Sequence, residues 1–126
     1  MQIGIYVDNQ TSLENLEEAV NLMKTEQEDI FLFTDDQLFQ AIPMSELACI
    51  NFSHILHYYG KILFMNPKDF NKKSRNLHGI IAVISKKEDL LKLDAELIKT
   101  KKAQVIIKDK KGLREAKNAE LQQLTR

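Results

Sequence analysis

The sequence predicts one α/β domain whose doubly wound, mostly parallel sheet is covered on both faces, giving three layers. Short runs rich in Ile, Val and Phe are nearly continuous rather than alternating, as strands buried on both faces are. Helical patterns separate most of these runs. Such alternation gives right-handed crossovers and a parallel sheet. The length of 126 residues fits one domain over residues 1–126.

Five apolar runs predict the strands. They cover residues 2–7, 30–34, 61–65, 79–84 and 104–108. Residues 38–44 are open to two interpretations, an extra strand or an irregular entry into the next helix. Pro43 argues against a central strand there, because proline cannot donate to a β-ladder.

Four helices are expected between and after these strands. The first follows Thr11, with Glu14 completing a capping box. The second covers residues 45–60, from Ser45 as N-cap to a glycine just past the end. The third opens at a capping box on Ser85 and runs to residue 100, and the fourth starts near Asp109. The apolar stripe of that last helix is Leu113, Ala116, Leu121 and Leu124.

Residues 66–78 show no clear helical pattern, so we expect a long loop between two strands. A loop of that length in a compact chain is functional or mobile. Taken together, the pattern predicts a Rossmann-like or flavodoxin-like fold, with no internal repeat or second domain.

Charge divides the chain into two parts. Residues 1–60 hold ten acids and one base, so their net charge is 1 − 10 = −9. Residues 61–126 hold 17 bases and eight acids, giving 17 − 8 = +9, and the whole chain is neutral. Zero net charge without an Arg-rich tract argues against general nucleic-acid binding.

The sequence favours a soluble protein of the cytoplasm. The first residues do not resemble a signal peptide, and no apolar run approaches the ~20 residues that span a bilayer. The single cysteine, Cys49, lies among Leu47, Ala48 and Ile50, which predicts a buried, inert thiol.

Ligands of open parallel sheets bind at the carboxyl ends of the strands, near the switch in strand order. The residues expected at this edge are Asp8, Asn9, Thr34, Asp35, Asp36, Asn66, Ser85 and Asp109. The candidates for ligand binding among them are Asp8, Asn9, Asp35, Asp36 and Asn66. Three converging carboxylates there would suit Mg²⁺. Alternatively, Asp8 starts a turn and the Asp35-Asp36 pair caps a helical turn. The sequence therefore assigns no metal site and no cofactor.

Residues 68–76 add a basic segment at the same edge. Its bases are Lys68, Lys72, Lys73 and Arg75, against one acid. Such a segment suits an anionic ligand such as a phosphate or a nucleotide. The alternative is a solvated loop whose bases keep the protein soluble.

Several enzyme classes lack their motifs. The turn after the first strand, residues 8–11, contains no glycine, and no P-loop motif is present, which argues against dinucleotide binding and P-loop NTPase activity. No GxSxG elbow marks a serine hydrolase. His54 and His57 lie three residues apart, but we interpret them as packing residues because no third metal ligand lies nearby.

Two resemblances remain. The rim is similar to that of a receiver domain in its acids, Ser85 and Lys108, but Asn66 stands where the phosphate-accepting Asp of that family would follow the third strand. The first 35 residues also resemble the opening of GT-B glycosyltransferase half-domains, on the strand that ends in Asp8 and Asn9. This second resemblance implies a nucleotide-sugar site, and it is an analogy of fold.

Two functional hypotheses follow. The first is a non-catalytic interaction module whose polarised charge attracts a protein partner or a second copy. The second is a domain that binds a phosphorylated ligand or a nucleotide sugar, with Asp8, Asp35 and Asp36 at its hydroxyls and the basic segment at its phosphate. Catalysis is less favoured, because no nucleophile–base pair emerges from the spacing.

Overall fold

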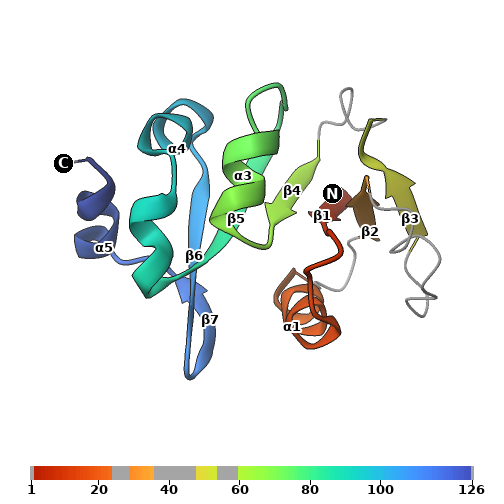
Figure 1. Cartoon of the computed structure of the whole chain (residues 1–126), viewed down its shortest axis with the longest axis horizontal. Helices are drawn as coiled ribbons and strands as arrows, with labels where there is room; N and C mark the ends of the chain where they lie inside the picture. The colour runs from red at the N-terminus through yellow and green to blue at the C-terminus, as the bar shows by residue number, and fades with distance from the viewer. Residues whose placement is uncertain (1, 24–28, 36–47, 54–59, 126) are drawn as a thin grey trace.

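The computed structural model in Figure 1 describes residues 2–23, 29–35, 48–53 and 60–125. The strands are β1 (Gln2–Tyr6), β2 (Asp29–Thr34), β3 (Ala48–Asn51), β4 (Lys61–Phe64), β5 (Ile80–Lys86), β6 (Gln104–Asp109) and β7 (Gly112–Glu115). The helices are α1 (Leu13–Met23), α3 (Pro67–Lys73), α4 (Ala95–Lys101) and α5 (Asn118–Gln122), with 3₁₀ turns η2 (Lys87–Lys92) and η3 (Gln123–Thr125).

The strands form one sheet in the order β3-β2-β1-β4-β5-β6-β7. Neighbouring strands run parallel from β3 to β6, and β7 runs antiparallel to β6. The predicted α/β class with a mostly parallel sheet is therefore confirmed, as are the five predicted strands. The order of the strands reverses between β1 and β4, which are adjacent in the sheet.

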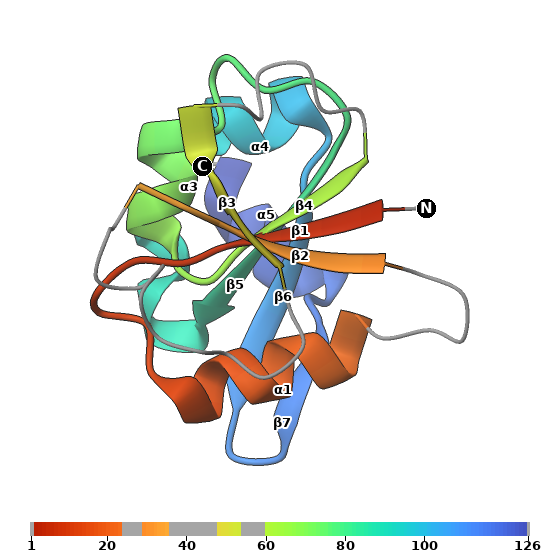
Figure 2. The ribbon, with the colours of Figure 1, turned by 90° about the vertical axis from the view of Figure 1, so that its right-hand side faces the viewer.

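Each face of the sheet carries its own apolar cluster, because successive side chains of a strand point to opposite faces. On one face Leu16, Ala19 and Met23 of α1 pack on Ile3, Ile5, Leu63 and Ile106. On the other, Phe70, Leu90, Leu97 and Leu124 pack on Phe33, Phe64, Val83 and Ile107. Figure 2 shows α1 on one side of β1 and β2, with α3 and α4 on the other side.

Helix α1 confirms the first predicted helix, but its cap differs from the prediction. Ser12, not Thr11, is the capping residue, since its Oγ accepts a hydrogen bond of 3.1 Å from Asn15 N. Thr11 instead bonds back to Asp8, which closes the turn between β1 and α1. The one-residue shift reflects two adjacent residues, each able to cap.

The predicted helix over residues 45–60 is wrong at Ala48–Asn51, which forms β3 beside β2. Residues 45–47 and 54–59 of that prediction, and the question of a strand at residues 38–44, lie outside the described residues. Cys49 is exposed on β3, so its predicted burial is wrong. Partial burial still raises the pKa of this thiol, which disfavours the reactive thiolate.

The predicted loop at residues 66–78 contains helix α3 instead. Asn66 caps it by accepting a hydrogen bond from Asp69 N, and Pro67 occupies the first turn, where its missing N–H costs nothing. Phe70 is fully buried and meets the Phe64 ring edge-on at 6.0 Å between centroids. One buried aromatic residue and a good cap therefore suffice for this short helix, although it lacks an extended apolar stripe.

The predicted helix opening at Ser85 is also wrong in its first part. Ser85 belongs to β5, and its hydroxyl donates to the Lys86 carbonyl rather than capping a helix. The chain then forms η2, and α4 begins only after Asp94, whose side chain accepts from the amides of Glu96 and Leu97.

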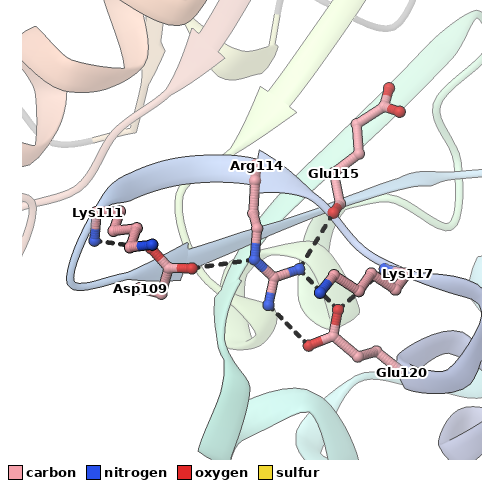
Figure 3. A network of polar contacts seen from close by, with 6 residues as sticks. All are labelled: Asp109, Lys111, Arg114, Glu115, Lys117 and Glu120. Carbon is pink, nitrogen blue, oxygen red and sulfur yellow. Dashed lines mark hydrogen bonds and ion pairs between the residues drawn. The ribbon is translucent and has the colours of Figure 1, made fainter.

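The predicted helix from Asp109 is replaced by the β6–β7 hairpin and the short α5. Gly112 takes a φ of 115°, which a glycine adopts without strain and which a helix does not contain. Figure 3 shows how Arg114 of β7 joins this hairpin to α5. Its guanidinium donates to both carboxylate oxygens of Glu120, at 2.7 and 2.9 Å, and to Asp109 Oδ2 at 3.0 Å.

Candidate functional site

A cavity of about 360 Å³ lies at the carboxyl ends of β1, β4 and β5. Asp8 and Thr11 line it from the β1–α1 turn, Asn66 and Lys68 from the start of α3, and Ser85 from the end of β5. The wall is completed by Asn15 and Glu18 of α1, by Lys86, Asp89 and Lys92 around η2, and by Lys108 and Leu113 of the hairpin. The volume is within the ~300–1,000 Å³ typical of ligand pockets.

The strand order explains the position of this cavity. β1 and β4 are neighbours, but the chain leaves β1 toward α1 on one face and leaves β4 toward α3 on the other. The two connections therefore diverge, and a crevice remains between them at the carboxyl edge. This is where open α/β sheets bind their ligands.

In the turn after β1, backbone amides donate hydrogen bonds to acceptors within the turn itself. Asp8 Oδ1 accepts hydrogen bonds from Gln10 N at 2.9 Å and from Thr11 Oγ1 at 3.2 Å. Thr11 N donates to the Asp8 carbonyl, and Asp8 N donates to Thr11 Oγ1. These amides are therefore not free to hold a pyrophosphate, which agrees with the absence of glycine from the turn.

A second carboxyl group, in the first turn of α3, has a raised pKa. Asp69, in the first turn of α3, is only 6% exposed and accepts a hydrogen bond of 3.0 Å from Asn66 Nδ2. Burial and the hydrogen bond and negative charge of Asp8 raise the pKa of Asp69 to about 6. The hydrogen bond from Asn66 and the charge of Lys68 oppose this rise, but do not outweigh it.

Four lysines surround the cavity. Lys108 donates to Asn15 Oδ1 and lies 3.7 Å from Glu18, and Lys92 pairs with Asp89 at 3.1 Å. The side chains of Lys68 and Lys86 are exposed and make no hydrogen bond or ion pair within the described part of the chain. These two side chains are therefore available to an anion that enters the cavity.

Asp35 and Lys73, both predicted as site residues, form a separate cluster instead of lining the cavity. Lys73 Nζ is 2.5 Å from Asp35 Oδ2 and lies over the ring of Phe52, 5.1 Å from its centroid. The Tyr6 hydroxyl donates to the same Asp35 oxygen at 3.5 Å. Burial and the nearby carboxylates raise the pKa of Tyr6, so this group stays protonated.

The remaining predicted residues are scattered. Asn9 is exposed in the β1–α1 turn, and Lys72 is exposed on α3. Arg75 lies 3.4 Å from Asp94, the cap of α4. Asp36 lies outside the described residues. Of the nine predicted site residues, the cavity therefore brings together Asp8, Asn66 and Lys68.

Metal binding finds no ready-made site in the part of the chain that the structure describes. There, no three His, Cys, Asp or Glu side chains lie close enough together to hold an ion. His54 and His57 lie outside that part, as does Asp36, one of the three carboxylates proposed for Mg²⁺.

Sequence reasoning left Asp69, Lys86 and Lys108 out of the site. Asp69 carried a signal, because an Asn three residues before an acid, with Pro67 between them, is typical of a helix start. Lys86 is the last residue of β5 and Lys108 the last but one of β6, so the rule that placed Asp8 and Asn66 at the carboxyl edge would have included them.

No helix within residues 2–23, 29–35, 48–53 and 60–125 is long and apolar enough to cross a membrane. Comparisons of the chain with protein-family models, with curated proteins and with solved structures find no match.

Proposed function

We propose that this chain is a Rossmann-like, three-layer α/β domain that binds a small anionic ligand in the cavity between β1 and β4. The ligand class is a phosphorylated compound or a sugar nucleotide. The observation that carries the proposal is the position of the cavity at the reversal of strand order, with Lys68 and Lys86 beside it.

The chemistry of the lining supports a polar ligand with one charged group. Lys68 and Lys86 are suited to a phosphate, because each ammonium offers three donors to its oxygens. Thr11, Asn15 and Asn66 offer hydroxyl and amide groups to the neutral part of the ligand, while Ile84 and Met65 provide an apolar floor. A ligand held by lysines needs no glycine-rich backbone cradle, so the occupied amides of the β1–α1 turn are no obstacle.

Binding without catalysis is the simpler form of this proposal. Ser85 is the hydroxyl placed deepest among the lining residues, at 2% exposed. Its proton is directed to the Lys86 carbonyl and not to a base that would activate it as a nucleophile.

Lysine variants test the proposal. Lys68→Ala and Lys86→Ala should each weaken binding of inorganic phosphate, or of a sugar nucleotide found by thermal-shift screening, by about tenfold, since a charge-assisted hydrogen bond contributes ~1.5 kcal/mol. Calorimetric titration measures the change. Lys72→Ala is the matched control, because Lys72 is exposed on the same helix as Lys68 and does not line the cavity. Equal losses in all three variants would reject a site at this position.

A second candidate is an interaction module. The strand order supports it, because residues 2–53 of the described chain supply β3, β2 and β1 while residues 60–125 supply the other four strands. The division of the sheet thus coincides with the change from a net charge of −9 to +9 along the sequence. A charged protein, or a second copy of this chain, is the partner that such a distribution suits.

A further inference from the structure

Two lysines of the cavity wall are neighbours in the sheet. Lys86 of β5 and Lys108 of β6 are paired in the register of these parallel strands, and both line the cavity. Each follows by two residues a side chain of the apolar cluster under α1, Ile84 and Ile106, so both lie on the face of the sheet that carries α1. Since neighbouring strands are only ~4.8 Å apart, the two ammonium groups can reach the same anion.

Like charges on neighbouring strands repel each other, and a negative group beside them relieves this repulsion. At Lys108 the negative group belongs to the chain itself. Lys108 Nζ lies 3.7 Å from Glu18 Oε2 and also donates to Asn15 Oδ1. Both partners come from α1 and line the cavity. Lys108 is therefore held by α1, whereas the side chain of Lys86 has no such partner among the described residues.

Glu18 differs from the other carboxylates of the cavity wall, which among the described residues are Asp8 and Asp89. Asp8 Oδ1 accepts from groups of the β1–α1 turn, and Asp89 pairs with Lys92 of the same 3₁₀ turn at 3.1 Å. The Glu18 carboxylate instead joins α1 to β6. The side chains of this ion pair are 34% and 31% exposed, and a pair with such exposure contributes little to stability. A ligand can therefore replace it at low cost.

We propose that Lys86 and Lys108 together bind the anionic group of the ligand, and that Glu18 competes with the ligand for Lys108. This inference rests on the proposed function and adds a third lysine to Lys68 and Lys86. In the ligand-free chain, the Glu18 carboxylate occupies Lys108. When the anion binds, Lys108 exchanges this carboxylate for the anion. The competition favours phosphate-like groups, because several oxygens allow one anion to accept from both lysines.

Glu18→Gln tests the competition, because glutamine keeps the size of the side chain and removes its charge. Sulfate is the probe, since its charge is constant near neutral pH, whereas phosphate titrates with a pKa of about 6. The variant should bind sulfate about fivefold more tightly than the wild type in calorimetric titration at constant ionic strength. Glu17→Gln is the matched control. It removes the same charge from an exposed residue of α1 that does not line the cavity, and should change the affinity by less than about twofold.

Lys108→Met, introduced into the Glu18→Gln chain, tests whether Lys108 contacts the anion. Methionine keeps an apolar stem, and the glutamine leaves no carboxylate without its partner. Sulfate binding should weaken by about tenfold, as for Lys86→Met in the same chain, because each change removes a charge-assisted hydrogen bond. Lys110→Met is the control, since Lys110 is exposed in the β6–β7 hairpin and does not line the cavity. Urea unfolding of each variant verifies that it is folded.

Two results would overturn the competition: an affinity of Glu18→Gln equal to that of the wild type, or an affinity that stays the same when Lys108→Met is added. The second result would mean that Glu18 only repels the anion from a distance. Failure of sulfate to bind either the wild type or Glu18→Gln would reject the proposed function as well. Binding that depends on Lys68 and Lys86 but responds to neither change at Glu18 and Lys108 would reject the competition alone.

Discussion

Gly4 has only a hydrogen atom as its side chain, and this allows the ring of Phe33 to pack directly against β1. A Cβ atom placed on Gly4 would lie 1.9 Å from Cε2 and 2.3 Å from Cδ2 of Phe33, which is itself buried in β2. The glycine therefore leaves room for an aromatic ring above the centre of β1. The need for this residue comes from close approach, since no unusual backbone angle is involved.

We expect Gly4→Ala to destabilise the protein by about 1–3 kcal/mol, as overpacking of a core does. Urea unfolding measures this change. Phe33→Leu removes the ring atoms that the new methyl group would meet, so the double variant should lose less stability than the sum of the two single variants. Strictly additive losses would contradict the close contact between these residues.

For single residues, the sequence predicts the place in the fold better than it predicts which other side chains each residue contacts. Asp8 and Asn66 were expected at the carboxyl edge because each directly follows an apolar run, and both line the cavity. Asp35 was placed by the same rule, yet its carboxylate pairs with Lys73, 38 residues away.

Among the elements, the β6–β7 hairpin and α5 depend on one arginine. Arg114 binds both carboxylate oxygens of the buried Glu120 and also Asp109, at the two ends of this unit. The hydrogen bonds from Arg114 and from Lys117 N lower the pKa of Glu120 to about 2, because they favour the ionised carboxylate. Glu120 therefore needs Arg114 in order to remain buried and charged.

Arg114→Ala should release α5 from the hairpin, because Glu120 would lose its guanidinium partner while remaining charged. We expect faster hydrogen exchange at the amides of α5 and β7 and a melting temperature lowered by several degrees. Arg75→Ala is the control, since Arg75 is exposed and its ion pair with Asp94, at 3.4 Å, is of the surface kind that contributes little to stability. Unchanged exchange in Arg114→Ala would show that apolar contacts alone hold α5.

The destabilising effect of Arg114→Ala should depend on pH. Since the folded state lowers the pKa of Glu120, its stabilising contribution is present above the unfolded value near 4.5 and disappears as the pH falls through about 2. The difference in melting temperature between wild type and Arg114→Ala should therefore be full at neutral pH and should narrow under strongly acidic conditions.

The hairpin also explains why one helix was predicted wrongly. Leu113, Ala116, Leu121 and Leu124 recur at helical intervals, but Leu113 lies on β7 and Leu121 on α5. The spacing of only four apolar residues could not distinguish one helix from a strand followed by a short helix. The evidence for a turn was Gly112 after two lysines, and it was the stronger signal. Long, apolar strands were predicted correctly because their burial on both faces leaves little ambiguity.

At the scale of the molecule, the strand order places β1, β2 and β3, which come from the acidic part of the sequence, on one side of the sheet and the other four strands on the other. Two ion pairs of the described chain join the halves, Lys73 with Asp35 and Lys108 with Glu18. In each pair, a lysine of the later part of the sequence neutralises a carboxylate of the early part. Glu14 and Glu17 on α1 are exposed and make no ion pair within the described residues, so acidic surface remains on the early half.

If this distribution attracts a second copy, association should depend on salt. At an ionic strength of ~0.01 M the screening length is about 30 Å, whereas at ~1 M it is about 3 Å, so electrostatic attraction between copies acts only under the first condition. Sedimentation velocity should then show a coefficient that rises with protein concentration in low salt and is constant in high salt.

A pair of matched variants assigns the effect to the acidic half. Glu14→Lys with Glu17→Lys reverses two exposed charges on α1 and should abolish the association, because it removes the acidic surface that the basic half of another copy would meet. Glu88→Lys with Glu96→Lys makes the same change of charge on exposed residues of the basic half, and should leave the association intact or strengthen it. A wild-type chain that sediments as a monomer at both salt concentrations would remove self-association, and the charge of the two halves would then matter only for a different partner.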